Sequence, residues 1–180
     1  MSPDLFTDGT ALPRYNEGMA ARKQYELLNP GAVAPDFRLA RLEGGEVALK
    51  DLLSAGPVLL VFYKTTCPVC QMTLPYVQRI HEAAAMPIYA ISQDDAADTR
   101  DFNREFHLTL PTLIDSEAAG FPASNAYGIS HVPTFYLVAP DGKILRTIES
   151  WSKSEMESLG ASVGVRVIQA TDRVPEFRPG

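Results

Sequence analysis

The stretch that decides the fold is VLLVFYKTTCPVCQMTL, residues 58–74. Its first six residues form an unbroken apolar run, and their β-branched and aromatic side chains predict a strand buried on both faces of a sheet. A helical pattern of apolar residues follows over residues 72–85. Cys67 and Cys70 therefore stand between the end of a buried strand and the start of a helix.

Strands and helices extend from this stretch in both directions. Before it, residues 36–40 and 46–48 flank a glycine turn and predict a hairpin. After it, the patterns predict strand 87–92, helix 98–106, strand 110–114, a hairpin of 134–138 with 143–148, and helix 152–163. This order predicts an α/β domain with a central mixed β-sheet and helices on both faces.

Cys67 and Cys70 are the only two cysteines of the chain, and they lie too close together to join distant parts of a fold. A Cys-x-x-Cys pair of this kind indicates redox or metal chemistry. At a helix start, free backbone N–H groups and the positive end of the helix dipole stabilise a thiolate, with a pKa of roughly 3.5–7.5. We therefore expect Cys67 to be the nucleophile and Cys70 to resolve the mixed disulfide.

Half of a zinc site is one alternative for this pair, and an inert pair is another. Zinc takes four ligands, and the nitrogen donors available are His81, His107 and His131. None of them stands at a ligand spacing from the cysteines or from another histidine. We expect no metal and no organic cofactor.

Three segments resemble the thioredoxin superfamily. Residues 62–75, FYKTTCPVCQMTLP, resemble its active-site strand, loop and helix, including the proline five residues after the second cysteine. Residues 127–135, YGISHVPTF, resemble the segment that ends in the family's cis-proline, here Pro133. Residues 34–37, APDF, resemble the first strand of the redoxin branch. An ordinary trans proline at a strand start is the alternative for Pro133.

The resemblance implies a thioredoxin-like domain over residues 31–164, preceded by a helical extension over residues 1–30 and followed by a tail over residues 165–180. From Cys67 to Pro133 the chain is longer than in minimal thioredoxins. The additional residues, around 95–114, resemble an inserted helix and strand. TlpA/ResA-like thiol:disulfide oxidoreductases and AhpC/TSA-related peroxiredoxins carry this insertion between the Cys-x-x-Cys helix and the cis-proline.

The resemblance also implies a substrate site and an activity. In this family the residue before the cis-proline, Val132 here, offers its backbone to a substrate strand, which is a form of strand addition. Thr66 and Pro133 would line the same groove. The implied activity is disulfide exchange with protein substrates, supplied with electrons by an unidentified reductant.

The chain departs from the family's pattern at three positions. Val61 replaces a buried acid that relays protons, Thr73 replaces a glutamate, and Thr66 replaces a tryptophan. We therefore expect slower or differently tuned exchange.

Two other functions stay open: a peroxiredoxin-like thiol peroxidase, in which Thr65 would mimic the family's threonine, and a non-catalytic binding module of the same fold.

Composition limits the partners. The formal net charge is −6, the sequence pI is about 5.0 and 46% of residues are hydrophobic. An acidic protein is a poor match for nucleic acid or an anionic membrane. The longest apolar run, residues 58–63, is far short of the ~20 residues of a membrane span. The first residues show no secretory signal, so we expect a cytoplasmic protein, or an exported one if a signal has been removed.

Other polar residues near the predicted site each have an ordinary structural interpretation. Lys64 could favour the Cys67 thiolate by its charge, but a solvated lysine is the simpler interpretation. Residues 93–95, Gln-Asp-Asp, follow a predicted strand and so reach the functional edge of the sheet, or they cap the next helix. His131 could tune the site near neutral pH, or form an ordinary hydrogen bond.

Overall fold

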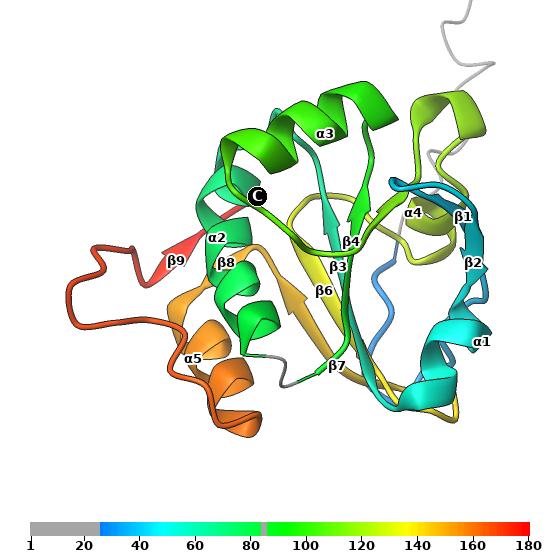
Figure 1. Cartoon of the computed structure of the whole chain (residues 1–180). Coiled ribbons are helices and arrows are strands. Elements are labelled where there is room, and N and C mark those ends of the chain that lie inside the picture. Colours follow the sequence, from blue (N-terminus) through cyan, green and yellow to red (C-terminus); the bar gives the residue numbers. More distant parts are fainter. Residues whose placement is uncertain (1–25, 84–85) are drawn as a thin grey trace, which may run out of the picture.

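The computed structural model describes residues 26–83 and 86–180. In this part of the chain a seven-stranded sheet has the order β2-β1-β5-β4-β3-β6-β7 (Figure 1). Its strands are β1 (Arg38–Arg41), β2 (Glu46–Ala48), β3 (Val58–Tyr63), β4 (Ile88–Ser92), β5 (Thr112–Ile114), β6 (Thr134–Val138) and β7 (Ile144–Glu149). Two short strands, β8 (Trp151–Ser152) and β9 (Phe177–Arg178), pair separately.

The α-helices of the described residues are α1 (Leu49–Leu52), α2 (Pro68–Glu82), α3 (Ala96–Glu105), α4 (Pro122–Ala126) and α5 (Lys153–Ser162). Strands β3, β4 and β5 are parallel, whereas β6 is antiparallel to β3 and β1 is antiparallel to β5. The predicted mixed sheet is confirmed. The predicted inserted helix and strand are also confirmed, because α3 and β5 lie between α2 and Pro133.

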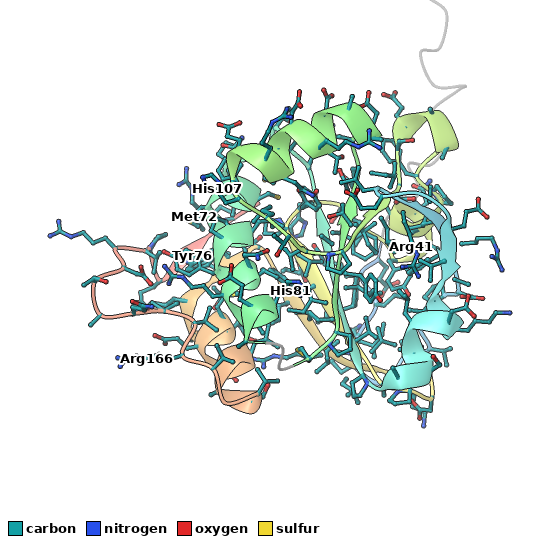
Figure 2. The ribbon with its side chains drawn as sticks, in the orientation of Figure 1. Arg41, Met72, Tyr76, His81, His107 and Arg166 are labelled. Atoms are coloured by element: carbon teal, nitrogen blue, oxygen red, sulfur yellow. The ribbon has the colours of Figure 1, made fainter. Side chains whose placement is uncertain are left out.

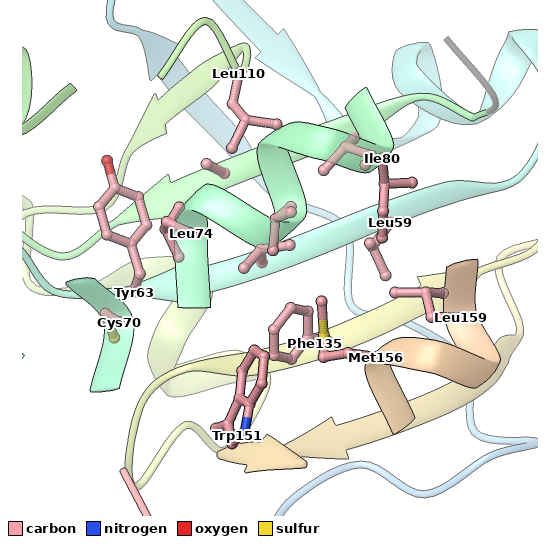
Figure 3. Close-up of a cluster of buried hydrophobic side chains, with 14 of the residues drawn as sticks. Leu59, Tyr63, Cys70, Leu74, Ile80, Leu110, Phe135, Trp151, Met156 and Leu159 are labelled. Atoms are coloured by element: carbon pink, nitrogen blue, oxygen red, sulfur yellow. The ribbon is translucent and has the colours of Figure 1, made fainter. Parts of the chain in front are cut away.

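Strand β3 lies at the centre and is buried along its whole length. Successive side chains of a strand point to opposite faces, so β3 contributes to two cores. Leu59, Val61 and Tyr63 face α2 and α5, as Figure 3 shows for part of this cluster. Leu60 and Phe62 pack on the other face, with residues of α1 and α4. The two-sided burial predicted from the apolar run is confirmed.

Helix α2 begins at Pro68, earlier than the apolar pattern over residues 72–85 indicates. Cys67 is its N-cap residue, and its sulfur accepts a hydrogen bond from the backbone N–H of Cys70 at 3.3 Å. Pro68 suits the first helical position because it has no N–H that needs a partner there. The helix therefore starts directly at the cysteine pair.

The predicted helical extension falls mainly on residues 1–25, which lie outside the described residues. Residues 26–30 carry no helix. They lie against the second core, where the N–H of Leu28 donates to the hydroxyl of Tyr136 at 3.3 Å and its carbonyl accepts from Thr147 Oγ1 at 2.8 Å. These residues are therefore attached to the domain by their backbone.

Residues 165–180, predicted as a tail, fold back along the domain in an extended course. Val167 and Ile168 are buried in the core that α2 and α5 share. Arg79 of α2 donates to the carbonyl of Val167 at 2.9 Å and forms an ion pair with Asp172. No helix among the described residues has the length and apolar character to span a membrane.

Candidate active site

The sulfur of Cys67 lies where strand β3 gives way to helix α2. The three residues after Tyr63 form a short loop, and Cys67 then caps the helix with extended backbone angles of φ −83° and ψ 115°. Cys67 is half-buried, whereas Cys70, one turn later, is completely buried. Both cysteines are free thiols. The pair therefore presents one accessible sulfur and one protected sulfur.

The surroundings of Cys67 favour its thiolate and lower its pKa to about 6. The largest cause is a hydrogen bond from the thiol of Cys70, and partial burial opposes it. The backbone N–H groups of Cys70 and Val69 add to the lowering, as does the positive charge of Arg178. At pH 7 most of Cys67 is therefore the reactive thiolate.

Cys70 has the opposite character. Burial is the main cause that raises the pKa of its thiol, and its hydrogen bond to Cys67 raises it further. It therefore keeps its proton at neutral pH. The two neighbouring sulfurs therefore differ in protonation at neutral pH. Cys67 is mostly a thiolate, and Cys70 is a protonated thiol.

The loop before β6 brings a second part of the chain to Cys67. The Val132–Pro133 peptide bond is cis, which confirms the expectation for Pro133. The sulfur of Cys67 lies 3.4 Å from the carbonyl oxygen of Val132, to which it donates a hydrogen bond when it is protonated. The structure therefore places Cys67, Val132 and Pro133 together. Thr66 precedes Cys67 and is exposed.

Two side chains hold the loop between β3 and α2 through the backbone of Thr65. The carboxylate of Asp94 accepts from the Thr65 N–H at 2.6 Å, and the amide of Gln71 donates to the Thr65 carbonyl at 2.9 Å. Asp94 stands just after β4, at the edge where the carboxyl ends of parallel strands meet. Sequence reasoning did not single out Gln71.

The neighbours of Asp94 act elsewhere. Gln93 donates to Ser124 at 3.0 Å, and Asp95 caps helix α3 by accepting from the N–H groups of its first turn. The capping interpretation is therefore confirmed for Asp95, and Asp94 contacts the cysteine loop instead.

His131 is hydrogen-bonded rather than directed at the cysteines. Its Nε2 lies 2.9 Å from a carboxylate oxygen of Glu149, and its Nδ1 lies 2.9 Å from the hydroxyl of Ser130. Lys64 is exposed, in agreement with the solvated interpretation. Within residues 26–83 and 86–180, no three His, Cys, Asp or Glu side chains gather as metal ligands.

The two positions where the family carries an acid contain other residues in the core. Val61 is completely buried among apolar side chains. Thr73 is also buried, and its hydroxyl donates to the carbonyl of Val69 inside helix α2 at 2.6 Å. Neither residue can take a proton from Cys70.

Comparison with known proteins agrees with this geometry. Residues 30–147 match the family model described as the AhpC/TSA family. The chain belongs to the AhpC/TSA family. The thiol-disulfide oxidoreductase ResA of Geobacillus thermodenitrificans is 34% identical over 122 residues, which cover 66% of this chain and 68% of that protein. This AhpC/TSA member is accordingly a thiol-disulfide oxidoreductase.

Solved structures support the fold. The thioredoxin domain of a thiol-disulfide oxidoreductase from Bacteroides vulgatus superposes with a TM-score of 0.66 at 24% identity, over 76% of this chain and 99% of that one. A putative thiol:disulfide interchange protein DsbE from Chlorobium tepidum gives a TM-score of 0.64 at 24% identity, over 78% and 99% of the two chains. The thioredoxin-like fold implied by the sequence motifs is confirmed.

Proposed function

We propose that the Cys67–Cys70 dithiol exchanges two electrons with disulfides of protein substrates, with Cys67 as the attacking sulfur. The observation that carries this proposal is the difference between the two sulfurs. Cys67 is accessible, lies at a helix start and has its pKa lowered to about 6, while Cys70 beside it is buried and protonated.

In the first step the Cys67 thiolate attacks one sulfur of the substrate disulfide. A new S–S bond joins Cys67 to that sulfur, the substrate's own S–S bond breaks, and the second substrate sulfur leaves as a thiolate that takes a proton from water. The hydrogen bonds that stabilise the Cys67 thiolate are lost in this mixed disulfide. This loss removes the hydrogen-bonded thiolate that raises the pKa of Cys70, so Cys70 loses its proton more easily than before.

In the second step Cys70 loses its proton and attacks the sulfur of Cys67. The Cys67–Cys70 disulfide forms, the bond to the substrate breaks, and the substrate leaves fully reduced. The two electrons have passed from the dithiol to the substrate, and a thiol reductant from outside the chain has to restore them. Because neither Val61 nor Thr73 is an acid, this second step lacks the proton acceptor found at those positions in relatives, and we expect it to be slow.

Substrate binding is proposed along the backbone of Val132. The carbonyl of Val132 lies within hydrogen-bond distance of Cys67, so an extended substrate segment that pairs with this backbone brings its disulfide to the attacking sulfur. Pro133 has no N–H to offer a substrate strand. Thr66, which precedes Cys67, is exposed.

A trapping experiment tests the roles of the two sulfurs. The Cys70→Ser variant, incubated with a protein disulfide such as insulin, should accumulate a mixed disulfide through Cys67, detected by mass spectrometry. The Cys67→Ser variant should accumulate none. An equal yield from both variants would contradict the assignment of Cys67 as nucleophile.

Reaction with hydrogen peroxide distinguishes disulfide exchange from the two alternative functions. Reduced wild-type protein is mixed with insulin or with hydrogen peroxide at equal concentration, and the loss of the Cys67 thiol is followed over time. Faster reaction with insulin supports exchange. Faster reaction with peroxide would favour the thiol peroxidase, and slow reaction with both would favour a binding module.

A further inference from the structure

Residues 175–180, called here the covering segment, run toward the active site. Strand β9 pairs with β8, so that Arg178 lies opposite Trp151 and Phe177 lies opposite Ser152. The indole N–H of Trp151 donates to the carbonyl of Pro175 at 2.7 Å. In Figure 1 this segment, drawn in red, ends beside the start of helix α2.

The last contact of the covering segment is with the residue before the cis-proline. The N–H of Gly180 donates to the hydroxyl of Ser150 at 3.0 Å. A Cβ atom placed on Gly180 would lie only 1.9 Å from the carbonyl oxygen of Val132. The backbone of Gly180 is therefore packed directly on that oxygen, at a distance that only glycine allows.

The same carbonyl oxygen faces Cys67. It lies 3.4 Å from the Cys67 sulfur, and the proposed function assigns it to the pairing of a substrate strand. While Gly180 is packed against this oxygen, the side of the carbonyl that it covers is closed to any other backbone segment. The covering segment and an extended substrate therefore compete for the place beside Val132.

We propose, on the basis of the function proposed above, that the covering segment is an internal competitor that selects among disulfide substrates. An extended protein substrate has to displace Gly180 from Val132 before its disulfide reaches Cys67. A small disulfide needs no strand pairing, and it reaches the half-exposed sulfur of Cys67 while the segment stays in place.

The contacts that hold the covering segment are few, so displacement is feasible. All six of its residues are exposed, and the side chain of Phe177 is 62% exposed. Its attachment consists of a two-residue strand pair, one hydrogen bond each to Trp151 and Ser150, and two contacts of Glu176 with Lys153. The backbone N–H of Lys153 donates to the Glu176 carbonyl at 2.9 Å, and the Lys153 ammonium forms an exposed ion pair with the Glu176 carboxylate at 3.0 Å. Segments with few buried apolar contacts open locally at low free-energy cost.

The fraction of molecules in which the covering segment contacts Val132 determines how much slower a protein substrate reacts. If the covering segment is in place in about nine molecules of ten, only about one tenth of the protein can bind a strand, and reaction with such a substrate is about tenfold slower. Reaction with a small disulfide is not reduced. The change in the ratio of the two rate constants between wild type and a variant without the Gly180–Val132 contact therefore measures this fraction.

Two substitutions in the full chain remove the covering segment from Val132 in different ways. Gly180→Val places a side chain where the Val132 carbonyl lies, so the contact cannot form. Ser150→Gly removes the hydroxyl that accepts from Gly180. Ser150 has a positive φ of 64°, which glycine adopts without strain. Arg166→Ala is the control, because this exposed residue lies outside the covering segment. In Figure 2 it lies below Met72 and Tyr76 of helix α2.

The experiment measures second-order rate constants of the reduced proteins with insulin and with oxidised glutathione. At a pH well above 6, Cys67 is a thiolate in every variant. We expect Gly180→Val and Ser150→Gly to react about tenfold faster with insulin and within about twofold of wild type with glutathione. Arg166→Ala should match wild type with both.

Two results would overturn the proposal: an unchanged rate ratio in both folded variants, or slower reaction with insulin, which would make the covering segment a contact that helps the substrate. Circular dichroism confirms folding, and Ser150→Gly carries the test if Gly180→Val does not fold. A wild type that reacts with neither disulfide through Cys67 would instead refute the proposed function, so the two failures are distinguishable.

Discussion

Replacing Cys70 by alanine removes the hydrogen-bond donor that lowers the pKa of Cys67 most. The backbone N–H groups of Val69 and of residue 70 stay in place, as does the start of helix α2. The substitution therefore isolates the contribution of one thiol. Cys70→Ser is the matched control, because its hydroxyl keeps a donor at the same position.

The expected magnitude follows from the exposure of Cys67. A hydrogen bond to a charged acceptor contributes ~1.5–3 kcal/mol, and one pKa unit corresponds to ~1.36 kcal/mol. Because Cys67 is only half-buried, solvent weakens the bond and the lower value applies. We expect the pKa of Cys67 to rise by about one in Cys70→Ala.

Alkylation by iodoacetamide measures this change, because only the thiolate reacts. The thiolate fraction increases as pH rises through the pKa, so a higher pKa gives slower reaction below it. At pH 6 the thiolate fraction falls from about one half to about one tenth, and alkylation of Cys70→Ala slows about fivefold relative to Cys70→Ser. Equal pH profiles for the two variants would refute the reasoning and assign the lowered pKa to the backbone N–H groups.

Two further predictions concern stability. Gly160→Ala places a Cβ 2.2 Å from a methyl group of Val167. This overpacking costs ~1–3 kcal/mol and opposes the ~1 kcal/mol gained in helix propensity, so we expect lower stability. A urea midpoint equal to that of wild type would contradict this prediction. Asp94→Ala leaves the half-buried N–H of Thr65 without its acceptor and should cost about 1 kcal/mol and slow disulfide exchange. Asp95→Ala, which removes only the cap of α3, should lower stability without slowing exchange.

Much of the fold could be predicted because its signals are local. The apolar run of β3 predicted a strand buried on both faces, and the cysteine pair after it predicted a helix start. Helix α2 begins four residues before the apolar pattern because its first turn, which includes Pro68, is defined by capping rather than by periodicity. The roles of the site residues, the domain boundaries and the cytoplasmic location stay predictions.

The covering segment could not be predicted from its own residues. Its Pro175 and Pro179 predicted an extended or partly ordered tail, but not where the tail lies. Its position depends on other parts of the chain. Trp151 is completely buried, and its indole N–H needs an acceptor, which the carbonyl of Pro175 supplies.

The sequence by itself predicted the nucleophile, because a cysteine at a helix start acquires its backbone donors from the next three residues. Only the tertiary structure decided what faces that sulfur. Val132 lies 65 residues away along the chain, Asp94 contacts Thr65 across 29 residues, and Gly180 reaches Val132 from the far end of the fold. The physical reason is that contacts between distant segments depend on the order of strands in the sheet and on which acceptors lie near buried hydrogen-bond donors. Short sequence patterns predict neither.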